Sequence, residues 1–539
     1  MIVISLMILL PPHQVSGSIT CSPSQSSFWK ICGPIQALGG IDEQPTVVQA
    51  NDGTLRLAWA HLTGTGVSNI YYSTRLTNGT WTGASALTSL GGQNQFPSIT
   101  QAGNGTVFVF WSYKAVTSSH YQIYYRYMKG STWSQYTPLP LTTPTGLNDT
   151  QPSTSLGRDG TLWLVWTRDN STAVGTSPVM RQLWYKTLNS TAWSPERSIT
   201  SPSDTNWNYQ PSILAGKDGL VRVAYARGQQ SLNNFQINYI YGTGSGWSVP
   251  NRIVTSNSTA HDANPSLIQD RNGTLWVFWT RDMTTNFAIR AESSVDNGAS
   301  WIGETAITAA CSTCADSQQP AAVQSSTDKN VWVFYSTNPS ITTFGIWALE
   351  TVSPISPVHD VSLAPAFFSV SNSIQFAGGF PGPYVGQSPI ESIYVTVQNI
   401  GDQPENIALH LTVSNTTSYS FVQTILVNAG ASGNFAFNWN TTGVKPARYA
   451  LLANATIPIE TLGNRGDNVA SVSNAIHLYP LGDVNLDGWI TIVDISIADL
   501  GYGATPGNSR WNPFADVTGG GIISIVDINY ITYHYGTRT

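Results

Sequence analysis

The chain has 539 residues, enough for three to four domains at roughly 150 residues each. Charged residues make up only 10% of it, against about 25% in ordinary soluble domains. The net charge of −6 disfavours a nucleic-acid partner, because proteins that bind phosphate backbones present basic surfaces. A hydrophobic content of 41% excludes a disordered chain. No apolar run reaches the roughly 18 residues that a membrane-spanning helix needs.

The N-terminus indicates export from the cell. Residues 1–10 are apolar, and Pro11, Pro12 and small residues follow them. This pattern resembles the hydrophobic and cleavage regions of a secretory signal, so residues 1–20 are expected to be a signal-peptide-like segment, although the basic start of such signals is missing. The alternative is a buried strand.

Cysteine usage fits an exported protein. The four cysteines are Cys21, Cys32, Cys311 and Cys314. An even number predicts two disulfides with three possible connectivities, of which Cys21 with Cys32 and Cys311 with Cys314 is favoured. A four-thiolate zinc site is the alternative, although only one pair has Cys-x-x-Cys spacing.

A repeat runs through residues 25–351. A Gln-Pro-like step recurs every roughly 50–60 residues. An Asp-Gly or Asn-Gly turn, suited to tight hairpins, follows most of these steps and leads into an alternating aromatic strand. Four short strands per repeat predict the blades of a six-bladed β-propeller. The residues before the prolines are Gln44, Phe96, Gln151, Gln210, Asn264 and Gln319.

The sixth repeat lacks its fourth strand. Residues 27–34 parallel residues 131–138 and likewise lead into a Gln-Pro step. The N-terminal strand is therefore expected to complete the sixth blade, which closes the ring without an exposed strand edge.

One turn of the propeller carries a recognisable motif. Ser294, Asp296, Gly298, Ser300 and Trp301 follow the pattern Ser-x-Asp-x-Gly-x-Ser-Trp. This resembles the Asp-box of the sialidase/BNR-repeat superfamily. The resemblance implies a structural role, with Asp296 bonding turn amides and Trp301 packing between strands, so it argues for a fold and not for catalysis.

Polar residues recur at two positions that are expected on one face of the propeller. One position precedes each Gln-Pro step and the other ends each second strand. We hypothesise that Arg168, Arg227 and Arg281 clamp a sugar carboxylate through forked hydrogen bonds. An aspartate would then act as acid or base on a glycosidic oxygen. The candidate catalytic residues are Asp42, Asp149 and Asp262, and His61 and Tyr113 join the arginines as candidate substrate-binding residues.

Three interpretations of these residues stay open. The first interpretation is sialidase-like catalysis. Sialidases use an arginine triad with an acid, a tyrosine and a glutamate, but this chain lacks a Phe-Arg-Ile-Pro motif and no Tyr/Glu pair can be assigned. Ligand binding without turnover is the second interpretation. In the third, each arginine pairs with a neighbouring acid, such as Asp169 or Asp282, to satisfy the blade ends.

Residues 352–480 are expected to form a second module. Short strands such as residues 394–401 and 434–439 alternate with period two, which predicts an immunoglobulin-like β-sandwich. The Val-Thr-Val-x-Asn-x-Gly strand, the Phe-x-Trp strand and the Tyr-x-Leu-x-Ala strand resemble the CARDB-type adhesion-associated domain. The resemblance implies a spacer or adhesion role.

A twelve-residue loop near the C-terminus fits calcium. Gly488 supplies the bend at position 6, and oxygen ligands with three carboxylates suit a hard cation. The ligands at positions 1, 3, 5, 9 and 12 are Asp483, Asn485, Asp487, Thr491 and Asp494, with the carbonyl of Trp489 at position 7. We therefore expect Ca²⁺ there.

The frame recurs in a second loop. Thr518 and Gly520 replace an amide and a carboxylate, so this site is expected to be weak or vacant. Short helices are expected at 495–500 and 528–535. The second ligand set is Asp516, Thr518, Ile522, Ser524 and Asp527.

The duplicated loop–helix resembles a type I dockerin over residues 481–539. The resemblance implies a cohesin-like partner. Both loops carry Ile-Val at positions 10 and 11, where cohesin-binding dockerins usually have polar or small residues. Docking on the neighbouring sandwich is the alternative.

Together these patterns predict a secreted, calcium-stabilised, mainly β protein. It would contain a six-bladed propeller, an immunoglobulin-like sandwich and a small α-helical, EF-hand-like dockerin. The expected function is recognition of a glycan or glycoprotein, with sialidase-like hydrolysis of O-glycosyl bonds left open. The alternative is a non-enzymatic adhesion or scaffold protein whose propeller binds protein partners.

Overall fold

The computed structural model describes residues 21–23, 28–36, 38–63, 66–139, 147–169, 181–189, 192–229, 234–253, 260–284, 286–308, 315–340, 343–353, 358–363, 368–370, 375–377, 390–460 and 464–538. The signal-like segment 1–20 and the pair Cys311 and Cys314 lie outside these residues. The chain forms two compact units, Met1–Ser356 with Thr461–Gly463, and Pro357–Glu460 with Asn464–Thr539. In the described part of the chain, no helix combines the length and apolarity that crossing a membrane requires.

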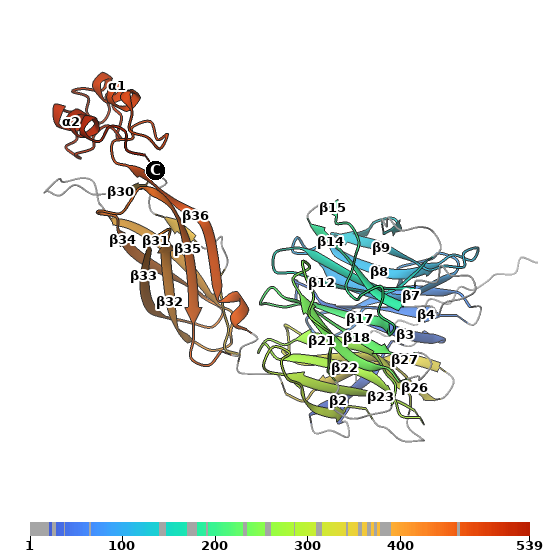
Figure 1. The fold of residues 1–539 in the computed structure, drawn as a ribbon. Coiled ribbons are helices and arrows are strands. Elements are labelled where there is room, and N and C mark those ends of the chain that lie inside the picture. Colours follow the sequence, from blue (N-terminus) through green and yellow to red (C-terminus); the bar gives the residue numbers. More distant parts are fainter. Residues whose placement is uncertain are drawn as a thin grey trace, which may run out of the picture. The chain divides into compact units, whose positions relative to one another are not determined.

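The first unit is a mainly β propeller, in which groups of antiparallel strands, called sheets below, follow one another along the chain (Figure 1). Short parallel pairings, β27 with β3 and β5 with β7, also join the last group to the first and the first to the second. We number the sheets one to six in chain order. Their innermost strands are β3 (Ile41–Gln49), β7 (Gln93–Gln101), β12 (Asn148–Leu156), β17 (Trp207–Ala215), β21 (Asp262–Gln269) and β25 (Ser317–Gln324). The second strands are β4 (Leu55–Leu62), β8 (Val107–Lys114), β13 (Leu162–Asp169), β18 (Val221–Gly228), β22 (Leu275–Asp282) and β26 (Val331–Ser340).

The outer strands complete each sheet. The third strands are β5 (Ser68–Arg75), β9 (Gln122–Lys129), β14 (Arg181–Asn189), β19 (Gln236–Gly242), β23 (Phe287–Ser294) and β27 (Thr343–Thr351). The fourth strands are mostly very short: β6 (Ser85–Ala86), β10 (Thr132–Trp133), β11 (Thr137–Pro138), β15 (Ala192–Trp193), β16 (Arg197–Ser198), β20 (Asn251–Arg252) and β24 (Ile302–Ala306). In sheet six, β2 (Trp29–Gln36) takes this place by pairing with β27, and β1 (Cys21–Pro23) pairs with β2.

The Gln-Pro steps are β-bulges around a central channel. In each innermost strand the register shifts at this step, as between Glu43 and Thr46 of β3. Gln44 has φ of 58° and the five equivalent residues have φ between 50° and 58°, a left-handed conformation. Proline fits after it because the bulge leaves no ladder bond for an N–H to make. The six steps together line a channel cavity of about 120 Å³.

Side chains join neighbouring innermost strands. Ser266 Oγ of sheet five accepts a hydrogen bond from the backbone N–H of Ala322 in sheet six, at 2.9 Å. The same bond links every earlier pair of sheets, through Thr46, Ser98, Ser153 and Ser212. The equivalent residue of sheet six is Ala321, which has no hydroxyl, so the junction of sheets six and one lacks this bond.

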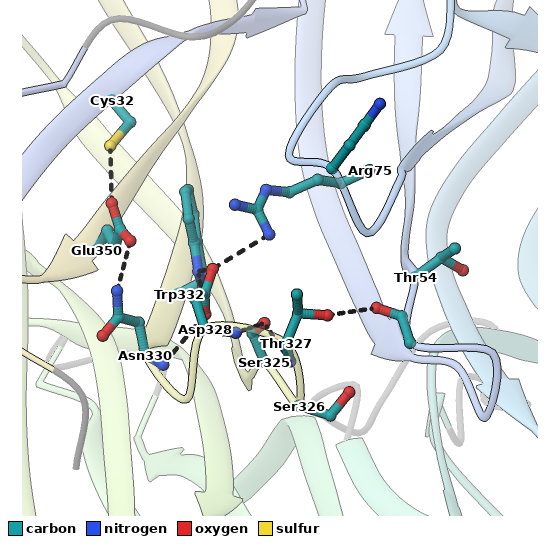
Figure 2. A network of polar contacts seen from close by, with 12 residues as sticks. Cys32, Thr54, Arg75, Ser325, Ser326, Thr327, Asp328, Asn330, Trp332 and Glu350 are labelled. Carbon is teal, nitrogen blue, oxygen red and sulfur yellow. Dashed lines mark hydrogen bonds and ion pairs between the residues drawn. The ribbon is translucent and has the colours of Figure 1, made fainter.

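Other contacts close that junction (Figure 2). Asp328 forms an ion pair with Arg75 at 3.1 Å, and the Arg75 guanidinium lies 4.6 Å from the centre of the Trp332 ring. Thr327 Oγ1 donates to the Gly53 carbonyl at 2.9 Å. The N-terminal strand therefore completes the last sheet, and side chains join that sheet to the first.

A disulfide joins Cys21 and Cys32, the pair that the spacing favoured. It links β1 to β2, and the Glu350 carboxylate lies 3.8 Å from Cys32 Sγ (Figure 2). Because both sulfurs are in the disulfide, Cys21 and Cys32 offer no thiolate to a metal beside Glu350.

The Asp-box turn has the hydrogen bonds that the motif implies. Asp296 accepts hydrogen bonds from the Ser300 amide and the Ser294 hydroxyl, both at 2.8 Å. Trp301 packs in the core between sheets four and five, with its ring centre 5.7 Å from that of Tyr239.

The second unit begins with two sheets that share one core. The first sheet holds β28 (Val361–Ser362), β29 (Phe368–Val370), β31 (Ile390–Asn399) and β34 (Ser432–Asn440). The second holds β30 (Gln375–Ala377), β32 (Glu405–Ser414), β33 (Ser418–Val427), β35 (Ala447–Thr456) and β36 (Val469–Pro480). Buried and exposed residues alternate strictly along β34, so Phe435, Phe437 and Trp439 face the core.

The C-terminal segment holds two helices, α1 (Ile492–Leu500) and α2 (Ile525–Tyr533). Both begin three residues earlier than predicted. Thr491 and Ser524 cap them, because each hydroxyl accepts from the third amide and the aspartate at that third position bonds back to the cap. The sequence prediction started the helices after the loop ligands and overlooked this capping box.

Candidate functional site

The predicted acids and bases form one repeated arrangement inside the propeller. In sheet three, Asp149 at the start of β12 faces Arg168 at the end of β13. Its carboxylate accepts from Arg168 Nε at 2.7 Å and Nη2 at 3.0 Å, and from Trp166 Nε1 at 2.8 Å. Arg168 also donates to Glu196 at 3.1 Å and is fully buried. Its guanidinium is therefore held between two carboxylates of the protein.

Sheet five repeats this arrangement. Asp262 accepts from Arg281 Nε at 2.6 Å and from Trp279 Nε1 at 3.0 Å. The second carboxylate partner of Arg281 is Glu304, and the Arg281 side chain is 4% exposed. In sheet one, His61 Nδ1 lies 2.8 Å from Asp42, which also accepts from Trp59.

Burial and pairing set the charges of these groups. Burial raises the pKa of Asp149 and of Asp262, while the hydrogen bonds from the paired arginines oppose the shift. A buried carboxylate that faces a guanidinium at hydrogen-bond distance is stabilised as an ion pair.

This geometry does not support the catalytic role predicted for Asp42, Asp149 and Asp262. Their carboxylates are buried and already accept hydrogen bonds within their own sheets. Nor are Arg168 and Arg281 accessible to a ligand. The ion-pair interpretation describes them, but the partners differ from those it named: Asp169 pairs with Arg181 at 3.1 Å instead.

Tyr113 occupies the equivalent position of sheet two. Its hydroxyl donates to the Gly91 carbonyl at 3.0 Å, and its ring packs edge-on against Tyr124. Asn94 accepts from Trp111 Nε1 at 3.0 Å, as the aspartates do in other sheets.

Sheet four breaks the repeated arrangement. Asn208 and Tyr225 stand where sheets three and five have aspartate and tryptophan. Arg227 therefore has no aspartate across the strand pair and bonds instead to Asp204, at 3.1 Å. Its side chain is 30% exposed, which makes it the accessible member of the three predicted arginines.

Three polar atoms beside this ion pair lack partners. Arg227 Nε, Tyr225 Oη and Asn208 Oδ1 are buried and have no hydrogen-bond partner within the described part of the chain. Asp204 accepts from the Asn206 amide and from Asn208 Nδ2 as well as from Arg227. Burial opposes these bonds, but together they hold the pKa of Asp204 below its ordinary value, so it is anionic at neutral pH.

A cavity of about 430 Å³ opens at this ion pair, between sheets three and four. Arg227 and Asp204 are the charged residues of its lining, and the remainder is hydroxyl-bearing or apolar. The other lining residues are Ile199, Thr200, Ser201, Ser203, Ile240, Trp247, Ser248, Val249 and Pro250. The volume falls in the range of pockets that hold small organic ligands.

An aromatic cluster flanks the start of β17. The guanidinium of Arg181 lies 4.2 Å from the ring centre of Trp207, and Tyr209 Oη lies 3.1 Å from His261 Nε2. Burial raises the pKa of Tyr209 and lowers that of His261. Trp207 and Tyr209 are nearly buried, so Arg181 and packing already cover these rings.

The first C-terminal loop folds around its end carboxylates. Asp483 accepts from the amides of Asp487 at 3.1 Å and Gly488 at 2.7 Å, and Asp494 accepts from that of Val484 at 2.7 Å. Burial, with the nearby Asp494 and Asp487 carboxylates, raises the pKa of Asp483 to about 6. Carboxylates gathered in this way repel one another, and a hard cation relieves that repulsion.

The second loop has Thr518 and Gly520 where the first has the ligands Asn485 and Asp487. Thr518 Oγ1 donates to the Asp527 carboxylate at 2.6 Å, so this hydroxyl is occupied by the carboxylate at position 12. Asp516 accepts from the amides of Gly520 and Gly521, as Asp483 does in the first loop.

Large apolar side chains are exposed at the same positions of both loop–helix repeats. Five pairs share this property, and the least exposed member, Ile522, is still 45% exposed. The pairs are Trp489 with Ile522, Ile492 with Ile525, Val493 with Val526, Leu500 with Tyr533, and Tyr502 with Tyr535.

Sequence reasoning missed the residues that decide the propeller site. Glu196 and Glu304 come from outer strands or turns at no fixed spacing from their arginines. Asp204 lies in a loop and carries no motif. The available signals were Asn208 and Tyr225, which replace the aspartate and tryptophan of sheets three and five, although sheet six also has a tyrosine, Tyr335, at the second position.

No protein-family model and no curated protein matches this sequence. Among solved structures, a protein of unknown function from Dyadobacter fermentans is similar at 14% identity and a TM-score of 0.48, over 63% of this chain and 99% of that one. An α-L-arabinofuranosidase of Fusarium graminearum is similar at 14% identity and a TM-score of 0.44, over 62% of this chain and 97% of that one. A Penicillium chrysogenum α-L-arabinanase gives 14% identity and a TM-score of 0.44, over 64% and 99% of the chains. At these values the similarity says nothing about the ligand of this chain.

Proposed function

We propose that this protein binds saccharides in the cavity between sheets three and four of its propeller. The observation that carries the proposal is the mixed lining of the cavity. Trp247 and the aliphatic residues offer an apolar wall for the carbon face of a sugar ring. Arg227, Asp204 and the serine and threonine hydroxyls offer donors and acceptors for its hydroxyl groups.

Binding to a panel of immobilised oligosaccharides tests this proposal. Trp247→Ala should weaken binding by about tenfold, because an aromatic wall contributes on the order of 1 kcal/mol beyond its buried area. Trp193→Ala is the matched control: this residue packs against Phe110 and Tyr125 as Trp247 packs against Trp163 and Tyr185, but it does not line the cavity. Equal loss in both variants, or no binding by the unaltered protein, would contradict the proposal.

We also propose the modular organisation that the sequence motifs favour. The first unit is a six-bladed, sialidase-like propeller, residues 352–480 are an immunoglobulin-like, CARDB-like spacer, and residues 481–539 are a dockerin-like module. Its first loop would bind Ca²⁺ through Asp483, Asn485, Asp487, Thr491, Asp494 and the carbonyl of Trp489. Secretion is proposed from the N-terminal segment and fits the disulfide between Cys21 and Cys32.

For the C-terminal module we propose a role in attachment. The duplicated exposed apolar pairs support it, because monomers rarely expose large apolar patches without a partner. A cohesin-like protein or the sandwich of the same chain would cover them. A pull-down with the Ile492→Asp/Ile525→Asp double variant tests this role, and retention of an attached partner by that variant would contradict it.

A further inference from the structure

We infer that the cavity at Arg227 selects uncharged saccharides over acidic ones. This inference rests on the proposed saccharide binding and names its ligand class. It differs from what the three arginines suggest in the sequence, where an arginine cluster predicts a carboxylate ligand.

The first argument is charge balance. Arg227 and Asp204 are the charged residues of the cavity lining, and their ion pair of 3.1 Å leaves the lining with no net charge. A ligand carboxylate would meet Asp204 as well as Arg227. It would have to displace Asp204 to gain a forked hydrogen bond, which would leave a largely buried carboxylate without its counter-charge.

The second argument is repetition. In sheets three and five the equivalent arginines each hold two protein carboxylates, Asp149 with Glu196 and Asp262 with Glu304. In sheet four the aspartate of the strand pair is replaced by Asn208, and a single carboxylate remains. Among the described residues, Arg227 thus keeps a free hydrogen-bond donor, while the Asp204 carboxylate balances its charge.

The third argument is the kind of atom left unsatisfied. Arg227 lines the cavity, and its Nε is a buried donor without a hydrogen-bond partner in the described part of the chain. A sugar hydroxyl, or a water bound with it, accepts from such a donor without bringing a second negative charge beside Asp204.

The test compares neutral and acidic saccharides of matched length. Isothermal titration uses the full chain with galactan and galacturonan oligosaccharides, and with mannan and mannuronan oligosaccharides. We expect tighter binding of at least one neutral member, by about tenfold or more over its uronic-acid counterpart. Its affinity should not change when the ionic strength is raised, because salt screens only charged attraction.

Asp204→Asn provides the decisive variant. It leaves Arg227 uncompensated, so the preference should reverse towards the uronic-acid member of the pair. Asp52→Asn is the matched control, since it removes the carboxylate of an exposed pair with Arg56 that does not line the cavity, and it should leave the preference unchanged. Should the Asp204 variant fail to fold, the salt dependence of the unaltered protein still decides.

The outcomes separate this inference from the function it rests on. Binding by the unaltered protein that favours uronic acids and weakens with salt would overturn the inference and leave saccharide binding standing. Absence of binding to both classes would overturn the proposed function itself.

Discussion

The guanidinium groups of Arg168 and Arg281 are both neutralised by carboxylates of the protein itself. Each guanidinium is buried between two carboxylates, and an indole N–H bonds one of them. Removing one partner of a buried pair leaves an uncompensated charge, which costs far more than the net value of the pair.

Asp149→Ala should therefore lower the free energy of unfolding by about 3–5 kcal/mol. Urea denaturation measures this change. Asp52→Ala is the control: Asp52 is 52% exposed in its pair with Arg56, so its loss should cost about 1 kcal/mol or less. A variant of Asp149 with unaltered stability but lost turnover of a glycan would instead restore the catalytic interpretation.

A second prediction concerns Ala321, which lacks the hydroxyl that joins neighbouring inner strands at the other junctions. At the other junctions, the hydroxyl oxygen at this position accepts a hydrogen bond from a backbone amide of the next sheet. That amide belongs to the residue after the equivalent position, which in sheet one is Val47. Ala321→Ser should supply the bond and raise the free energy of unfolding by about 1 kcal/mol.

Ala291→Ser is the control for this substitution. Ala291 belongs to the buried apolar core between sheets five and six, so a hydroxyl there is expected to lie among apolar side chains and to destabilise the propeller by about 1–3 kcal/mol. Equal effects of the two substitutions on the melting temperature would contradict the proposed hydrogen bond between sheets six and one.

The positions of the strands followed from sequence far better than the partners of the charged side chains. The Gln-Pro steps marked the inner strands because a bulge needs a positive φ and tolerates proline at one fixed place. Glu196 and Glu304 meet their arginines through turns of variable length, so no spacing identifies them. The helix starts were missed because Thr491 and Ser524 serve both as loop positions and as caps.

At the scale of elements, the connection between β35 and β36 carries a buried acid. Glu460 accepts from the Val361 amide at 3.3 Å and from Asn468 Nδ2. Burial, with Asp360 and Asp467 nearby, raises the pKa of Glu460 to about 7. This cluster joins β28 to the short 3-10 helix Arg465–Asp467.

The sandwich should therefore lose stability between about pH 4.5 and pH 7. The folded state holds the Glu460 proton more tightly than the unfolded state, so its stabilising contribution is full below about pH 4.5 and is lost as the pH rises through 7. The expected loss is roughly 2–4 kcal/mol. Thermal unfolding across this range measures it, and Glu460→Gln should flatten the profile; a variant with the same slope would refute the assignment.

At the scale of the whole molecule, the long repeat made the closure of the propeller predictable. A ring of sheets must satisfy the edge of its last strand, and only the N-terminal segment matched the missing one. The break in sheet four was not predictable in the same way. A tyrosine in place of tryptophan is an ordinary substitution until the structure shows the unsatisfied atoms beside it.

The chain should unfold in two separate transitions, because its two units have separate cores and each sheet of the propeller bonds to its neighbours. Calorimetry should show that Ala321→Ser shifts only one transition. Adding Ca²⁺ should raise only the other, since ligands that bind the native state stabilise the unit that holds them.

Asp483→Ala should abolish the calcium effect, whereas Asp516→Ala should leave most of it, because Thr518 already occupies the position-12 carboxylate of the second loop. One transition that moves as a whole with every change would mean that the units are thermodynamically coupled, and an undiminished calcium effect in Asp483→Ala would place the cation elsewhere.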